Sequence, residues 1–260
     1  MKVLQISFLL FAFSVSSCEK ASETLSKWQR DLVIKRYGLD PDKTKQIAEW
    51  EKEIIKYEDI INEKVEAGLK EAKLYRKIGE AYAGMEMYQP CVDNLQKAID
   101  LGYLNEEIFF IQALCLGSLA RKQNWEETYR NNAEAAFLKA LSVNPDYHRA
   151  KLELGLLYFY GFGSKSKFSV NSEKIESSDR EYREKGIILV KEYQTFLPAK
   201  VDGYLILAGM YSSTGKRKEA IAQLQSAVSL FRKSYPKDFE KREDYRQTLL
   251  NLKNLQGRNP

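Results

Sequence analysis

Few side chains in this sequence could carry acid–base, metal or nucleophilic chemistry. The chain has one histidine, His148, so no pair of imidazoles is available for a zinc site. Cys91 and Cys115 are too far apart for a Cys-x2-Cys motif, and no Gly-x-Ser-x-Gly motif occurs. Carboxylate pairs such as Glu49 and Glu53 lie on strongly polar helical segments, which is typical of solvated helix faces. The sequence therefore predicts a protein that is not an enzyme and that uses no metal or cofactor.

One glycine pair, in Gly161-Phe162-Gly163, raises the possibility of a phosphate site. A phosphate-binding loop follows a strand and closes with Gly-Lys and Ser or Thr, but here the preceding residues have helical periodicity. Pro145 ends one helical segment, and His148 lies at the start of the next, where we expect polar side chains to be exposed. This stretch is therefore interpreted as part of a helical pattern and not as a ligand site.

The composition favours a folded helical protein without a nucleic-acid partner. The 260 residues are enough for one sizeable core or a short array of repeats. The net charge is +5, but Lys and Arg alternate with Asp and Glu along nearly every segment. Since nucleic-acid binding requires a concentrated basic patch, the charge pattern argues against it.

Two helical patterns alternate along the chain. In the first, a small residue stands among large apolar residues three or four positions away; it is centred on Gly79, Ala113, Gly155 and Ala208. In the second, a small residue is followed by others at spacings of four and three; it begins at Cys91, Ala133, Gly186 and Ala220. These spacings place each group on one face of a helix, where the small residues let a neighbouring helix approach closely.

This alternation resembles the tetratricopeptide repeat, a 34-residue helix–turn–helix unit. The closest copies carry "NLQKAIDL" after Tyr88, and "KEAIAQLQSAVSL" after a turn at Gly215. Four copies span 72–234, with insertions near 118–130 and 161–180. The second insertion is polar and rich in Gly and Ser, so we expect a surface loop. The resemblance implies an all-α fold, an antiparallel helix-hairpin solenoid with a superhelical course.

Further helices are predicted on both sides of the repeats. Residues 40–71 would form N-terminal capping helices, with Asp40 as the N-cap and Pro41 at the first helical position. Residues 235–260 would form a C-terminal capping helix. The inward-facing residues of that last helix are expected to be Tyr245, Leu249 and Leu252.

The N-terminus has the order of a secretory signal. In residues 1–17 a lysine precedes an apolar run that is too short to span a bilayer, and small residues follow. "VSSC" at Val15–Cys18 resembles a bacterial lipobox, which implies that Cys18 is acylated and begins the mature chain. Residues 18–39 would then form a polar tether and a short helix. The alternative is a plain signal peptide followed by an incidental cysteine.

An exported compartment would permit a disulfide between the two remaining cysteines. Cys91 and Cys115 both lie inside apolar helical patterns, however, so we expect two small buried hydrophobic residues that are not paired.

In the tetratricopeptide family, ligand-facing positions lie on the first helix of each hairpin. Carried over to this sequence, these positions form a mostly apolar groove with one cation. The predicted groove residues are Phe110, Leu114, Arg149, Leu152, Leu156, Phe159, Tyr160 and Leu205. An exposed apolar patch of that size exceeds what a soluble monomer usually tolerates, so something should cover it. The cover is either a segment of another protein or this chain's own C-terminal helix or inserted loop.

The sequence thus predicts a lipid-anchored scaffold that mediates protein–protein interaction in a bacterial envelope complex, as an assembly, secretion or transport accessory subunit. Its partners would be another envelope protein in the groove and the membrane through N-terminal acyl chains. The alternative is a periplasmic accessory protein that binds a hydrophobic small molecule for a transporter. A closed pocket around Leu156 and Phe159 would favour the small molecule, and an open trough would favour a polypeptide.

Overall fold

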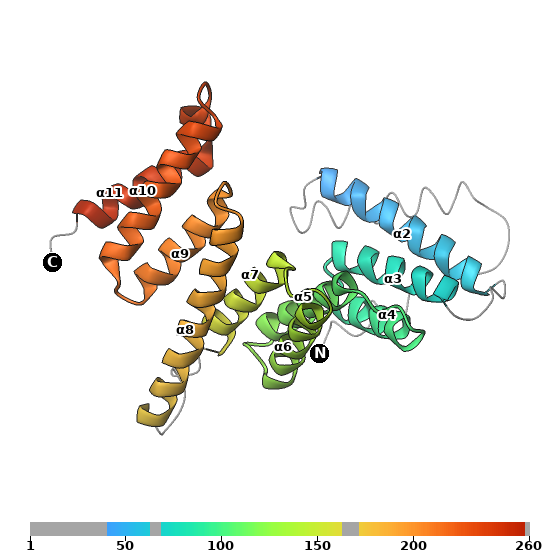
Figure 1. The fold of residues 1–260 in the computed structure, drawn as a ribbon. Helices are drawn as coiled ribbons and strands as arrows, with labels where there is room; N and C mark the ends of the chain where they lie inside the picture. The colour runs from blue at the N-terminus through green and yellow to red at the C-terminus, as the bar shows by residue number, and fades with distance from the viewer. Residues whose placement is uncertain (1–40, 63–68, 163–171, 258–260) are drawn as a thin grey trace, which may run out of the picture. The chain divides into compact units, whose positions relative to one another are not determined.

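The computed structural model describes residues 41–62, 69–162 and 172–257, and their regular structure is entirely helical (Figure 1). Helix α2 (Pro41–Asn62) begins at the proline that the sequence places at the first helical position. The chain divides into two units, 1–53 and 54–260, and the second holds the repeats. The predicted tether, the short helix before residue 40 and Cys18 lie outside the described residues.

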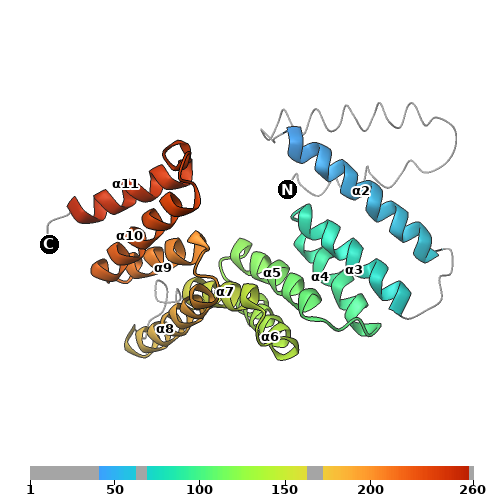
Figure 2. The same ribbon diagram turned by 45° about the horizontal axis from the view of Figure 1, so that its top comes forward.

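Within residues 54–260 the helices pair as consecutive antiparallel hairpins (Figure 2). The hairpins are α3 (Leu69–Gly84) with α4 (Tyr88–Asp100), α5 (Glu106–Lys122) with α6 (Glu127–Val143), α7 (His148–Leu156) with α8 (Ser172–Phe196), and α9 (Val201–Ser213) with α10 (Arg217–Ser234). The second helix of each hairpin also packs on the first helix of the next. This nearest-neighbour packing is that of a solenoid, so the predicted fold class is confirmed.

Small residues allow the closest helix contacts, as the spacing predicts. Gly79, Ala113, Gly155 and Ala208 are all buried. The tightest approach joins α7 to α8: a Cβ atom added at Gly186 would lie 2.6 Å from the carbonyl oxygen of Gly155. Because backbone atoms fill this space, no side chain can be accommodated there without separating the two helices.

Helix α7 continues into a π-helix, η1 (Leu157–Phe162). Its end is held by the buried Arg130 of α6, whose Nη1 donates to the carbonyl oxygen of Gly161 at 3.2 Å. The Arg130 guanidinium also lies 4.3 Å from the centroid of the Phe162 ring. Short π-helical segments are frequent at functional sites, and this one borders the pocket described below.

The two insertions form more helix than the sequence predicts. The insertion near 118–130 lengthens both α5 and α6 and leaves only a short connection. The prediction of a surface loop over 161–180 is wrong at both ends: Gly161 and Phe162 are helical and buried, and residues 172–180 form the start of α8. Residues 163–171 lie outside the described part of the chain.

Cys91 of α4 and Cys115 of α5 form a disulfide, with their Cα atoms 6.6 Å apart. Both residues are buried as expected, but the prediction that they are unpaired is wrong. The two cysteines belong to helices of neighbouring hairpins. The spacing of apolar residues within each helix does not show that the cysteine-bearing faces of α4 and α5 contact each other, so the pairing could not be predicted from it. The bond covalently joins the first hairpin to the second.

The C-terminal helix α11 (Glu243–Gly257) packs on α10, the second helix of the fourth repeat. A single 3-10 turn, η3 (Phe239–Lys241), precedes it. Tyr245 and Leu252 are buried with Leu224 and Phe231 of α10, and Leu249 packs on the same cluster. Helix α11 therefore covers the surface around α9 and α10, including Leu205, and does not enter the pocket between α5 and α7.

Candidate functional site

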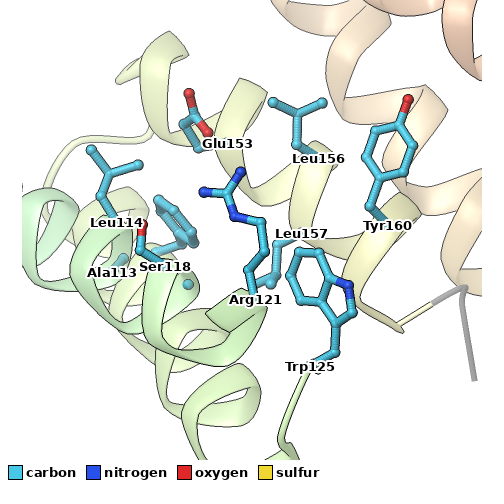
Figure 3. Close-up of a pocket in the computed structure, with 11 residues that line it drawn as sticks. Ala113, Leu114, Ser118, Arg121, Trp125, Glu153, Leu156, Leu157 and Tyr160 are labelled. Carbon is cyan, nitrogen blue, oxygen red and sulfur yellow. The ribbon is translucent and has the colours of Figure 1, made fainter. Parts of the chain in front are cut away.

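Three of the predicted groove residues, Leu114, Leu156 and Tyr160, line a cavity of about 440 Å³, here called the central pocket (Figure 3). Its walls come from α5, α7 and η1, with one residue each from α6 and the α5–α6 connection. The lining residues are Ala113, Leu114, Gly117, Ser118, Arg121, Trp125, Phe137, Glu153, Leu156, Leu157 and Tyr160. Most of them are apolar, and Arg121 and Glu153 are the two charged members.

Phe110 and Phe159 belong to the core and do not line this pocket. Phe110 is 3% exposed, because the Tyr147 ring packs edge-on at 5.2 Å and the Arg149 guanidinium lies 4.9 Å above it. Phe159 is 4% exposed and packs against α8 at Gly186. The expectation that these two rings face a ligand is therefore corrected: elements distant in sequence cover them.

The other predicted groove residues lie elsewhere. Arg149 is exposed above Phe110. Leu152 is partly buried in the cluster between α7, α8 and α9. Leu205 lines a separate cavity bounded by α9, α10 and α11. The predicted groove is thus divided, and only its middle part forms the central pocket.

Trp125 is a pocket residue that the repeat pattern of the sequence does not indicate. It follows Asn124 in the α5–α6 connection, and both residues have left-handed backbones, with φ of 53° for Asn124 and 60° for Trp125. A positive φ is rare for a bulky residue. The conformation is held by a hydrogen bond of 2.6 Å from the Trp125 N–H to the carbonyl oxygen of Ala120. The only sequence signal was a single tryptophan within a polar insertion.

Two neighbours fix the Trp125 indole against the π-helix. The Glu126 carboxylate caps α6 by accepting hydrogen bonds of 3.0 Å from the N–H groups of Thr128 and Tyr129, which anchors the connection. The indole packs on Gly161, where an added Cβ would lie 3.0 Å from the ring. Backbone strain of about 1–3 kcal/mol per residue persists only where the surroundings enforce it, and it is common at binding sites.

The polar groups of the pocket come from two neighbouring first helices. Arg121 extends from α5 into the pocket, and the Glu153 carboxylate of α7 reaches the same space (Figure 3). Burial raises the pKa of Glu153, and the positive charges of Arg121 and Arg149 partly oppose this shift. Within the described part of the chain, neither the Arg121 nor the Glu153 side chain forms a hydrogen bond or a close ion pair.

Glu153→Gln is expected to stabilise the unliganded protein near neutral pH. The pKa of Glu153 is raised on folding, so above that pKa the charged carboxylate lowers the free energy of unfolding. This loss of stability disappears as the pH falls through the pKa and the carboxyl becomes protonated. The melting temperature of the variant should therefore exceed that of the wild type at about pH 7, and the difference should shrink toward about pH 4. A difference that is independent of pH would contradict this assignment.

The remaining candidates for chemistry have structural explanations. His148 stacks on Phe196 with ring centroids 4.1 Å apart, so it is not the exposed side chain that we expected. No group of His, Cys, Asp and Glu residues in 41–62, 69–162 or 172–257 could hold a metal ion. Of the helices described, none has the length and hydrophobicity that crossing a membrane requires.

Comparison with known proteins gives the same fold. A family model described as tetratricopeptide repeat matches residues 201–234, which correspond to α9 and α10. The crystal structure of MamA matches with a TM-score of 0.55 and 18% identity, covering 75% of this chain and 97% of MamA. A thermophilic TPR protein of Thermus thermophilus, TTC0263, matches with a TM-score of 0.52 and 18% identity, covering 85% of this chain and 96% of its own.

No curated protein sequence matches the chain significantly. The structural matches share the helical-hairpin fold with this chain. The repeat spacing, the hairpin packing and the family match agree with one another. Residues 201–234 therefore match the tetratricopeptide repeat, and hairpins α3 to α10 form a helical solenoid with the fold of the structural matches.

Proposed function

We propose that this protein is a lipid-anchored scaffold of the bacterial envelope that holds a segment of another protein in the central pocket. The observation that carries the proposal is the meeting of three uncommon features in one place. A left-handed Trp125, the π-helix η1 and two charged side chains without close partners all line or border the pocket. Departures of this kind from local preference are expected at functional sites.

The pocket has the composition of a protein-binding surface. Trp, Tyr and Arg are the residues that most often dominate binding energy at protein interfaces, and Trp125, Tyr160 and Arg121 supply one of each. Leu114, Leu156 and Leu157 add apolar contact area. The preformed walls would lower the entropy loss on binding, because Trp125 is already held by its backbone hydrogen bond and by Gly161.

The envelope location is supported by two features that are far apart in the sequence. The "VSSC" stretch and the polar segment after Cys18 fit a lipid anchor with a tether. The buried disulfide between Cys91 and Cys115 fits an oxidising compartment, since structural disulfides are rare in the cytosol. A role as an assembly, secretion or transport accessory subunit is consistent with a scaffold placed there.

In-cell photocrosslinking from position 156 tests the proposal. A photoreactive residue replacing Leu156 should capture a specific protein in the membrane fraction, because Leu156 lines the pocket. The same residue at Leu138, a 47% exposed position on α6, serves as the matched control and should not capture it. In a Cys18→Ser background the protein should leave the membrane fraction. Capture that is identical from both positions, or absent from position 156, would refute the pocket as the binding site.

A hydrophobic small molecule is the second candidate ligand. The volume of about 440 Å³ lies within the range of small-molecule sites, and the lining is mainly apolar. However, Phe159 does not contribute to the enclosure that this hypothesis expected. Native mass spectrometry of the purified protein would show a bound compound that Leu156→Trp, by filling the pocket, should displace.

A further inference from the structure

We propose that the central pocket recognises a neutral amide, the peptide bond of an extended apolar segment, through Arg121 and Glu153. This inference rests on the proposed function and specifies the chemistry of its partner. The guanidinium is only a hydrogen-bond donor, and the ionised carboxylate is only an acceptor. A group bound between them must therefore accept from Arg121 and donate to Glu153.

The positions of the two side chains make such bridging possible. Arg121 lies near the end of α5 and Glu153 lies within α7, so they approach the pocket from adjacent hairpins. Figure 3 shows both side chains directed into the same space, beside Leu156. The two side chains do not form a close ion pair with each other. Arg121 is nevertheless near enough for its positive charge to lower the pKa of the Glu153 carboxyl. The space between them is therefore available to a ligand.

Charge complementarity selects the amide over charged groups. A ligand carboxylate would pair with Arg121 but would be repelled by Glu153, and a ligand ammonium would have the converse conflict. A peptide bond offers one C=O acceptor and one N–H donor, and it leaves the charge of the pocket unchanged. Hydrogen bonds to charged groups are also stronger than neutral ones, so both side chains would contribute to affinity.

The apolar walls specify which residues flank the amide. Trp125, Leu156 and Tyr160 lie to one side of the charged pair, and these side chains would contact a large apolar residue next to the bound peptide bond. This surrounding favours a main-chain amide between apolar side chains over the isolated amide of Asn or Gln. A role in binding would also account for the partly buried carboxylate of Glu153, which reduces the stability of the unliganded protein.

Three leucine derivatives of different charge test this inference; the neutral one carries an amide on both sides of the leucine, and each charged one carries a single amide. They are N-acetyl-leucine N-methylamide, which is neutral, N-acetyl-leucine, which is anionic, and leucine N-methylamide, which is cationic. Binding to the full chain would be followed by fluorine NMR of 5-fluorotryptophan, with the Trp125 signal assigned from Trp125→Phe. We expect the neutral probe to bind at least about tenfold more tightly than either charged probe, from the strength of hydrogen bonds to charged groups.

Two variants separate the roles of the charged side chains. Arg121→Gln should weaken binding of the neutral probe by about tenfold. Glu153→Gln should selectively strengthen binding of the anionic probe, because the repulsion between its carboxylate and that of Glu153 is removed. Lys122→Gln, which removes an equal charge from the adjacent position on α5, is outside the pocket lining and should change neither affinity. Thermal melting of each variant would show that the fold is retained.

The outcomes distinguish this inference from the proposed function. Tightest binding of the anionic probe, equal binding of all three, or no shift of the Trp125 signal would overturn amide recognition. If crosslinking from position 156 still captured a protein in that case, the proposed scaffold function would stand without the amide. If crosslinking also captured nothing, the central pocket would lose both roles.

Discussion

Gly186→Ala is expected to destabilise the protein by roughly 2–3 kcal/mol, even though alanine is the better helix former. The added Cβ would lie 2.6 Å from the carbonyl oxygen of Gly155 and 3.0 Å from the backbone nitrogen of Phe159. These are backbone atoms and cannot rotate away, so α7 and α8 would have to separate. Urea unfolding followed by circular dichroism would give the difference in the free energy of unfolding.

Gly117→Ala is the matched control for this prediction. Gly117 is also within a helix, but an added Cβ there meets no atom within 4 Å. The helix-propensity gain of up to about 1 kcal/mol should then appear as a small stabilisation. If Gly186→Ala and Gly117→Ala changed the free energy of unfolding equally, the close approach of α7 to α8 would be refuted.

Removal of the disulfide is the second large effect that we expect. The bond closes a loop with a sequence separation of 24 residues, which corresponds to about 3 kcal/mol of stabilisation through restriction of the unfolded chain. Replacing both Cys91 and Cys115 by alanine should lower the free energy of unfolding by about that amount. Chemical unfolding with and without a thiol reductant would measure it.

The reductant provides the control for the disulfide. In a Cys18→Ser background, which removes the third thiol, reductant should destabilise the chain that retains Cys91 and Cys115. It should leave the double alanine variant unchanged, because no bond remains to be reduced. Equal sensitivity of the two proteins would show that the cysteines are not paired in solution.

The repeat architecture could be predicted from the sequence because its signals are local. Spacings of three and four residues around Gly79, Gly155 and Ala208 define which face of a helix each residue occupies, and the observed hairpins follow those faces. The start of α2 at Pro41 likewise depends on the residue's own backbone preference.

The candidate site was only partly predictable for the same reason. The resemblance to the tetratricopeptide repeat placed Leu114, Leu156 and Tyr160 among the ligand-facing positions, and all three line the central pocket. It could not show that Tyr147 and Arg149 would cover Phe110, or that α8 would bury Phe159. Exposure depends on which other element packs over a face, and that element is distant in sequence.

The tertiary structure alone revealed Trp125, the π-helix and the disulfide. Two consecutive left-handed residues turn Trp125 toward Gly161, which is far from it in the sequence, and only their packing makes that conformation tolerable. Cys91 and Cys115 are joined because α4 and α5 are neighbours in space. Helical period is a property of each segment, whereas contacts between segments depend on the assembled chain. The helices and their buried faces were therefore predictable from local sequence, but the residues of the site were determined by packing between segments.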